Sequence, residues 1–341
     1  MNQHSKPQVT RQSLFAMMQA YKNTSLLKTG ISLGLFSAIT EPTGAAATAA
    51  AIGADERGTR ILLQALAALR IVESDGDLYW LTSDTAELLN PKNPGYVGDM
   101  VHVFASDWEW DALKRFPEAV RTGGTVLDEH AETPGYAYWE DFASYAPVVA
   151  APTAEVMTEA LAPWASGLQE LNVLDVACGH GVYGATIAQR FGQARLTALD
   201  WENVLPLAER QADSLGVRDR MDLISGDMFD IPLGGPYELV LITNVLHHFS
   251  ETRATELLRR AASALKPGGR LGIVGFTTTD ALPADDPAPY LFSVLMLAWT
   301  SEGEVHSERS YDRMLQAAGF SEAERHSVPG LPFRVLTAIR A

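Results

Sequence analysis

Short apolar runs alternate with amphipathic stretches through the second half of the chain. Five runs have the length and composition of buried strands, and they cover residues 171–176, 194–199, 221–224, 237–243 and 271–276. Residues 182–191 carry apolar side chains at the spacing of a helix. Strands that alternate with helices predict an α/β fold with a mostly parallel sheet. The last two runs, 322–329 and 333–340, predict a hairpin at the edge of that sheet.

The N-terminal part shows a helical pattern instead. Between residues 13 and 39 apolar side chains recur at helical spacing, which predicts two helices broken around Asn23 and Thr24. Residues 48–82 then predict helix, turn, helix and hairpin, with an Asp-Gly-Asp turn at 75–77. The first two helices carry more apolar surface than a small domain buries, and such an excess predicts a partner chain.

A mostly helical segment, residues 96–161, is rich in aromatic side chains. For most of these rings we expect a place in the core between helices. Some are candidates for an apolar acceptor pocket, because clefts between domains are common ligand sites. The candidates are Trp108, Trp139, Phe142 and Tyr145.

Composition narrows the class of protein. The 341 residues are 47% hydrophobic and 20% charged, which predicts a globular chain with more than one domain. Acidic residues outnumber basic ones by 42 to 26, so the formal charge is −16, and nucleic acid and membranes are poor partners. The lone cysteine, Cys178, fits a reducing compartment. No signal pattern or membrane-spanning run is present, so we expect a cytoplasmic protein.

Three glycines follow the first buried strand. Gly179, Gly181 and Gly184 fit the spacing of a dinucleotide-binding turn, and glycines let the backbone pass close to a ligand. Asp175 stands four residues earlier, where its carboxylate repels a pyrophosphate and favours a cationic amino acid. Residues 175–181 resemble motif I of class I methyltransferases, which bind S-adenosylmethionine (SAM). The alternative is a structural strand-turn-helix without a ligand.

The ends of the next strands carry further candidates for SAM binding. Asp200, followed by Trp201, ends the second strand, and one carboxylate can accept hydrogen bonds from both ribose hydroxyls. Its structural alternative is a cap for the helix that follows. Asp227, Met228 and Phe229 follow the third strand, and in the methyltransferase pattern this segment encloses adenine; otherwise it is a surface turn. Thr243 ends the fourth strand and completes the cofactor set.

The order of these motifs, with Lys266-Pro267-Gly268-Gly269 before the fifth strand, resembles the class I methyltransferase fold. This resemblance implies a Rossmann-like sheet of seven strands, mostly parallel, with the last one antiparallel. The N-terminal part resembles the winged-helix dimerisation domain of small-molecule O-methyltransferases. We therefore expect a helical dimerisation domain over 1–95, a helical linker contributing to the acceptor pocket over 96–168, and a SAM-binding catalytic domain over 169–341.

His247 is the candidate catalytic base, since imidazole titrates near neutral pH and this histidine follows the fourth strand. The segment is similar to the Leu-His-Asp-Trp segment of plant-type O-methyltransferases, whose histidine deprotonates the acceptor hydroxyl. His248 replaces the aspartate. The plant-type enzymes place two glutamates beside the base, but this chain has Gly275-Phe276-Thr277 at one place and Val305 at the other. A structural role for His247 at a helix start is the alternative.

Two other functions remain open. His247 or His248, with His306 and a carboxylate, could hold a divalent metal that enolises an α-keto acid for C-methylation, although a lone histidine such as His306 is more often on the surface. A winged helix also occurs in DNA-binding proteins, so a SAM-sensing regulator is the non-enzyme alternative.

The preferred prediction is a SAM-dependent methyltransferase of specialised, antibiotic-type metabolism. It would methylate a phenol or other hydroxyl of a small-molecule acceptor, release S-adenosylhomocysteine, and act as a homodimer.

Overall fold

The computed structural model describes residues 9–341, and the chain divides into two compact units after Ser106. Each unit has a hydrophobic core of its own. The three-part division expected from the sequence, with boundaries near 95 and 168, stays a prediction. Within 9–341, none of the helices combines the length and the apolar character needed to cross a membrane.

The first unit contains helices around a small antiparallel sheet with the strand order β1-β3-β2. Its elements are α1 (Arg11–Gln19), α2 (Tyr21–Ser32), α3 (Leu35–Ala38), β1 (Thr43–Gly44), α4 (Ala45–Ile52), α5 (Glu56–Ala68), β2 (Glu73–Asp75), β3 (Leu78–Trp80), α6 (Ser83–Leu89), η1 (Gly98–Met100) and α7 (Val101–Phe104). Helices α4 and α5 with the β2–β3 hairpin form the predicted helix-turn-helix-hairpin.

The predicted helix break at Asn23 and Thr24 is wrong. Helix α1 begins at a capping box, in which the side chain of Thr10 accepts a hydrogen bond from the Ser13 backbone N–H at 3.1 Å. The chain then changes from α1 to α2 at Ala20. Asn23 and Thr24 lie in the first turn of α2, where such residues cost a helix little.

Helix α1 has no buried residue. Its apolar side chains and those beside it are exposed by 43–74%, and they are Val9, Leu14, Phe15, Met17, Met18 and Tyr21. The apolar excess predicted from the sequence is therefore present on the surface of this unit. Its coverage by a partner chain stays a prediction.

The second unit is built on a seven-stranded sheet with the order β6-β5-β4-β7-β8-β10-β9. Its strands are β4 (Leu171–Val176), β5 (Ala194–Asp200), β6 (Met221–Ser225), β7 (Tyr237–Thr243), β8 (Leu265–Gly275), β9 (Glu324–Ser327) and β10 (Arg334–Ile339). The first five strands of that order pair in parallel, and β10 is antiparallel to both of its neighbours. Only the last strand of the chain runs against the others, which confirms the predicted sheet.

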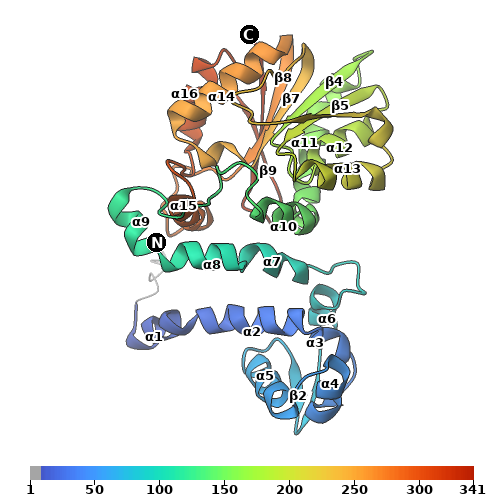
Figure 1. Cartoon of the computed structure of the whole chain (residues 1–341), viewed down its shortest axis with the longest axis vertical. Coiled ribbons are helices and arrows are strands. Elements are labelled where there is room, and N and C mark those ends of the chain that lie inside the picture. Colours follow the sequence, from blue (N-terminus) through green and yellow to red (C-terminus); the bar gives the residue numbers. More distant parts are fainter. Residues whose placement is uncertain (1–8) are drawn as a thin grey trace, which may run out of the picture. The chain divides into compact units, whose positions relative to one another are not determined.

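Helices cover both faces of this sheet, as Figure 1 shows. One face packs against α14 (Glu251–Ala264) and α16 (Glu308–Ala317), and the other against α11 (Pro147–Ala165), α12 (Val182–Arg190) and α13 (Leu205–Ser214). The remaining helices of this unit are α8 (Asp107–Lys114), α9 (Phe116–Thr122), α10 (Tyr138–Tyr145), η2 (Arg218–Arg220), η3 (Leu246–His248) and α15 (Ala288–Trp299).

Strand β8 is longer than predicted, because the Lys-Pro-Gly-Gly turn lies within it. Leu265 pairs with Tyr237, and the next pair joins Arg270 to Leu239, so the residues between them bulge from the ladder. Gly268 has φ +75°, a conformation that glycine adopts without strain. The turn residues thus interrupt the strand locally without ending it.

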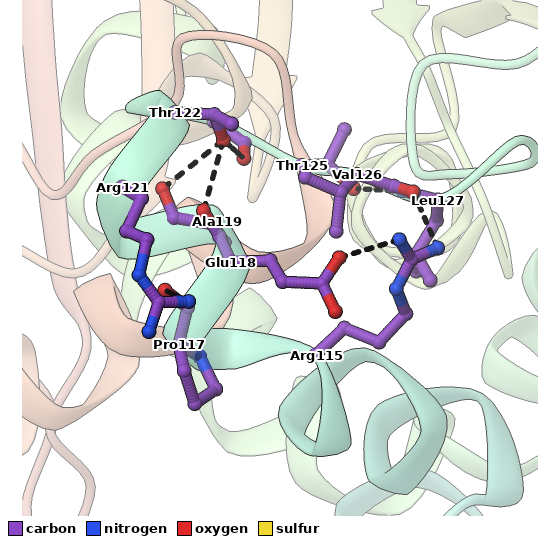
Figure 2. A network of polar contacts seen from close by, with 10 residues as sticks. Arg115, Pro117, Glu118, Ala119, Arg121, Thr122, Thr125, Val126 and Leu127 are labelled. Carbon is purple, nitrogen blue, oxygen red and sulfur yellow. Dashed lines mark hydrogen bonds and ion pairs between the residues drawn. The ribbon is translucent and has the colours of Figure 1, made fainter.

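Hydrogen bonds and an ion pair hold the segment that follows α9 in place (Figure 2). The guanidinium of Arg115 donates to the Val126 carbonyl at 2.8 Å and to the Glu118 carboxylate at 2.6 Å. Beyond the network, Thr125 N–H donates to the Thr300 carbonyl at 2.9 Å. A Cβ at Gly124 would lie 2.4 Å from the Ser301 carbonyl oxygen, so only glycine allows this approach. The network positions the chain leading to residues 131 and 132, which line the cavity described next.

Candidate active site

A cavity lies at the carboxyl ends of the four neighbouring strands β6, β5, β4 and β7. Each of the loops that follow these strands contributes lining residues. Ligands of open α/β sheets bind at this edge, where the strand order reverses around the first strand. The helical segment closes the cavity with Ala131, Glu132, Trp139 and Phe142.

The three glycines after β4 have different environments. A Cβ at Gly179 would meet nothing within 4 Å, its φ is +53°, and it lines the cavity. A Cβ at Gly181 would lie 2.9 Å from Ala208 of α13, and one at Gly184 would lie 2.6 Å from Leu196 of β5. Gly179 therefore leaves room for a ligand, whereas Gly181 and Gly184 permit close packing of α12. Gly181, predicted to bind the cofactor, is not among the lining residues.

Asp175 lies beneath this turn and outside the cavity lining. Its Oδ2 accepts the Gly184 backbone N–H at 3.0 Å, and its Oδ1 has no partner among the described residues. Burial raises the pKa of Asp175 to about 8. The carboxyl group predicted to meet the cationic end of SAM thus holds the start of α12 in this structure.

Asp200 lies at the end of β5 and faces the cavity. Its two oxygens accept backbone N–H groups, Oδ2 from Gly179 and Oδ1 from Trp201, both at 2.7 Å. Each oxygen keeps a lone pair for a further donor, so two ribose hydroxyls can still bind. Burial raises the pKa of Asp200 to about 6. The cap alternative is not realised, because α13 has no side-chain cap.

The loop after β6 brings Asp227, Met228 and Phe229 to the cavity, as predicted for an adenine site. Asp227 Oδ1 accepts the Phe229 N–H at 2.8 Å, which fixes the turn. The guanidinium of Arg253 lies 3.9 Å from the centre of the Phe229 ring, within cation–π range. Arg253 also lines the cavity, and nothing in the sequence had marked this helix residue.

The loop after β7 supplies Thr243, which was predicted, and Asn244, which was not. Asn244 has φ +55°, and its amide donates to the Tyr183 hydroxyl at 3.3 Å. Asn244 lines the cavity, and its buried Oδ1 has no partner among the described residues. An unpaired buried acceptor at this place suits an ammonium donor.

The two adjacent histidines of η3 have different places. His248 lines the cavity, whereas His247 does not. The rings lie 4.9 Å apart, and the His247 ring meets the Phe292 ring edge-on at the same separation. Burial lowers the pKa of His248 to about 4 and that of His247 well below its ordinary value. Both imidazoles are therefore neutral at pH 7 and able to accept a proton.

Helix α10 forms an aromatic wall of the cavity. Trp139 stacks on His248 with ring centres 5.4 Å apart, and Phe142 stacks on His180 at 6.0 Å. Burial also lowers the pKa of His180 to about 4. Trp139 and Phe142 were predicted to line an acceptor pocket and do line this cavity, but Trp108 and Tyr145 do not. His180 was missed, although its position between two glycines of the motif could have indicated it.

His306 is 2% exposed, so the expectation of a surface histidine is wrong. Its Nε2 lies 3.2 Å from the Leu246 carbonyl oxygen. Within residues 9–341, His, Cys, Asp and Glu side chains nowhere gather in a group of three or more that could hold a metal. The donor set proposed for His247, His248 and His306 is therefore not assembled.

The lining residues fit SAM. Carboxylates outnumber guanidinium groups there, since Glu132, Asp200 and Asp227 face one arginine, which suits a cationic ligand. Gly179, beside which a Cβ would meet nothing within 4 Å, and Asn244, whose Oδ1 is unpaired, line the same cavity as the adenine candidates. These are features that a ligand with hydroxyl and ammonium groups would satisfy.

Comparison with protein families gives two matches. Residues 150–321 match the O-methyltransferase domain, and residues 15–90 match the O-methyltransferase dimerisation domain. The chain belongs to the O-methyltransferase family. As a member of this family it uses SAM as the methyl donor and transfers the methyl group to oxygen, as the sequence predicted.

Individual relatives agree with this assignment. The mitomycin biosynthesis 6-O-methyltransferase of Streptomyces lavendulae is 28% identical over 336 residues, which cover 95% of this chain and 93% of that protein. The 3-hydroxy-5-methyl-1-naphthoate 3-O-methyltransferase of Streptomyces sahachiroi is 27% identical and covers 90% of this chain and 89% of its own length. These relatives are O-methyltransferases of antibiotic pathways, and they support a role of this chain in specialised metabolism.

Solved structures agree as well. A candidate O-methyltransferase from Nostoc punctiforme is 29% identical, has a TM-score of 0.91, and covers 97% of this chain and 100% of its own. Human N-acetylserotonin methyltransferase, solved with SAM, is 21% identical with a TM-score of 0.80, covers 100% of both chains, and shares the fold. The dimerisation-domain match of residues 15–90 supports the enzyme over the SAM-sensing regulator.

Proposed function

We propose that this O-methyltransferase acts on a hydroxyl group of an aromatic small molecule. The observation that carries the proposal is the aromatic wall, where Trp139 and Phe142 of α10 stack on His248 and His180. A cavity wall made of four aromatic rings gives a planar acceptor ring apolar surface to pack against. The naphthoate 3-O-methyltransferase supports the same acceptor class, because its name gives a hydroxylated aromatic substrate.

The residues at the strand ends would hold the methyl donor. Asp200 accepts the ribose hydroxyls, Asp227, Met228 and Phe229 enclose the adenine, and Asn244 accepts from the ammonium group. When bound, SAM supplies a sulfonium-linked methyl group that is already strongly electrophilic. The protein then has to orient the acceptor, exclude water and remove the hydroxyl proton.

His247 is the proposed base, because it occupies the place of the catalytic histidine in the Leu-His-Asp-Trp segment that this chain resembles. Its ring is neutral, and it lies behind His248 and against Phe292. His248 is the second candidate, since it is the histidine of the pair that lines the cavity. In either case a neutral imidazole accepts the hydroxyl proton as the methyl group is transferred.

The two adjacent histidines provide matched variants for a test. His247→Gln and His248→Gln would be compared in steady-state turnover with a panel of phenols and naphthols, with SAM affinity measured by calorimetry. We expect His247→Gln to lower kcat by about 10²-fold, a typical loss for a missing general base, with SAM affinity unchanged. A larger loss of kcat in His248→Gln than in His247→Gln would assign the base to His248. Normal turnover in both variants would refute base catalysis by this pair.

We also propose that the enzyme is a homodimer formed through its N-terminal unit. The match to a dimerisation domain and the exposed apolar side chains of α1, such as Met17 and Met18, support this proposal. Light scattering should give twice the chain mass of 37.0 kDa. Replacing Met17 and Met18 together by Glu should shift the mass toward a single chain. A wild-type protein that stays at the mass of one chain would contradict the proposal.

A further inference from the structure

The buried polar atoms without a hydrogen-bond partner among the described residues include a set of four, and three of these belong to His247 or to side chains near it. They are His247 Nδ1, Thr277 Oγ1, His306 Nδ1 and Tyr311 Oη. All four side chains are at most 2% exposed. Leaving buried polar atoms unpaired is costly, so a group of them in one region indicates that something else satisfies them.

Two of these atoms border the same space beside Gly275, the last residue of β8. A Cβ built on Gly275 would lie 3.4 Å from Tyr311 Oη and 3.7 Å from His247 Nδ1, and no other heavy atom beyond the chain neighbours comes within 4 Å. This segment is where the plant-type enzymes carry a glutamate that orients the base. A polar site with two or more partners and enough room can hold an ordered water.

The hydrogen-bond direction in this region follows from His306. Its Nε2 lies 3.2 Å from the Leu246 carbonyl, which can only accept, so a neutral His306 carries its proton on Nε2. Its Nδ1 is then an acceptor and requires a donor. The Tyr311 ring lies 6.0 Å from the His306 ring, and we assign the role of that donor, through water, to its unpaired hydroxyl. The Tyr311 oxygen is left free to accept from the side of Gly275.

We propose that Tyr311 is the positioning residue of His247 and acts through ordered water beside Gly275. The proton order runs in one direction: His247 Nδ1–H donates to the water, the water donates to Tyr311 Oη, and the Tyr311 hydroxyl donates toward His306 Nδ1. This order fixes His247 as the Nδ1–H tautomer and leaves Nε2 unprotonated. Tyr311 and water thereby take the place of the absent glutamate.

The expected loss of kcat rests on the proposed function, in which His247 is the base. The tautomer of His247 does not, because the ring has a preferred tautomer whether or not it is the base. Two readouts therefore separate the two claims. The ¹⁵N chemical shifts of the His247 ring, assigned by comparison with His247→Gln, report the tautomer at pH 7.5. The loss of kcat in His247→Gln reports the base.

Tyr311→Phe removes the hydroxyl and keeps the ring. We expect the ¹⁵N spectrum of His247 to change from a single Nδ1–H tautomer to a mixture, and kcat to fall about 10-fold, as is common when an orienting partner is lost. KM for the acceptor and SAM affinity should stay within about twofold. Tyr237→Phe is the matched control, since it removes a buried phenol whose hydroxyl donates to the Leu233 carbonyl at 3.0 Å. Tyr237 begins β7, at the opposite edge of the sheet from Gly275, which ends the parallel strand β8.

Gly275→Ala tests the water while leaving the hydroxyl in place. Its Cβ makes only ordinary contacts with Tyr311 Oη and His247 Nδ1, so the fold should tolerate it, but the methyl group occupies the space assigned to the water. We expect the same change of tautomer and kcat as in Tyr311→Phe. Gly192→Ala is the control, because a Cβ there meets nothing within 4 Å.

An Nε2–H tautomer of His247 in the wild-type protein would overturn the proposal. So would unchanged spectra and unchanged kcat in both Tyr311→Phe and Gly275→Ala. A changed tautomer in these variants, together with full turnover in His247→Gln, would support the positioning role and refute His247 as the base.

Discussion

The raised pKa of Asp200 predicts that SAM binding weakens in mild acid. In the proposed binding mode, ribose hydroxyls donate hydrogen bonds to the ionised carboxylate of Asp200, and burial raises the pKa of this group to about 6 in the free protein. At pH 5 about nine-tenths of the molecules carry the protonated form, so the apparent Kd for SAM should be about tenfold higher than at pH 8. Isothermal titration calorimetry from pH 5 to 8 measures this directly.

The same shift has a consequence for folding. A carboxyl group whose pKa rises from 3.8 to about 6 on folding disfavours the fold once it is ionised, by about 3 kcal/mol. This destabilisation is absent below about pH 4, where the group is protonated in both states, and is complete above about pH 6. If SAM binds as proposed, its hydroxyl groups donate to the carboxylate and offset this destabilisation.

Asp200→Asn separates binding from stability. The variant loses the buried charge, but one of the N–H groups of Gly179 and Trp201 loses its acceptor at a cost of about 1–3 kcal/mol. The two effects oppose each other, so the melting temperature at pH 7.5 should change little. SAM affinity should fall at least about 10²-fold, since two charge-assisted hydrogen bonds are weakened.

Three buried ionisable groups near Asp200 titrate outside the window from pH 5 to 7. Burial raises the pKa of Asp175 to about 8 and lowers those of His180 and His248 to about 4. The change in the apparent Kd for SAM between pH 5 and 7 should therefore vanish in Asp200→Asn. A wild-type Kd that is flat over this range, or a variant that keeps the full pH dependence, would refute the assignment of Asp200 to the ribose.

Three further substitutions test the architecture of the site. Gly124→Ala should destabilise the protein by about 1–3 kcal/mol in thermal denaturation, because its Cβ would lie 2.4 Å from the Ser301 carbonyl oxygen, whereas Gly167→Ala, with its nearest contact at 3.6 Å, should be neutral. Gly179→Ala should weaken SAM binding in calorimetry, because its Cβ enters the cavity and φ +53° strains alanine; unchanged affinity would place SAM away from this turn. Trp139→Leu should raise the acceptor KM about 10-fold and leave SAM affinity within twofold, and a large loss of SAM affinity would contradict a role of this ring at the acceptor.

The sheet could be predicted because its strands are buried on both faces. Such strands appear as short apolar runs, and the residues at their ends fall on one edge by topology alone. This explains why Gly179, Asp200, Asp227 and Thr243 were found from the sequence and do line the cavity. The helix break at Ala20 was missed because alanine carries no local signal for a helix end.

Side-chain direction could not be predicted to the same extent. His247 and His248 are neighbours in a single turn of 3₁₀ helix, and only the path of that turn decides which ring lines the cavity. Asp175 was predicted to meet the cofactor, but its hydrogen bond to the Gly184 N–H depends on how α12 packs against β4, which the sequence pattern does not specify. The space behind His247 depends on Gly275 and Tyr311, which are brought together only by the packing of α16 on the sheet.

The cavity lining has two parts that differ in how well they should tolerate substitution. Its donor side consists of loops held by four adjacent strands of a rigid sheet, and its aromatic wall belongs to a single short helix, α10. Under the proposed function, mutations in α10 would alter which acceptor ring is taken without disturbing the strand-end loops proposed to bind SAM. Helix α10 is therefore the first segment to randomise when selecting for a new acceptor.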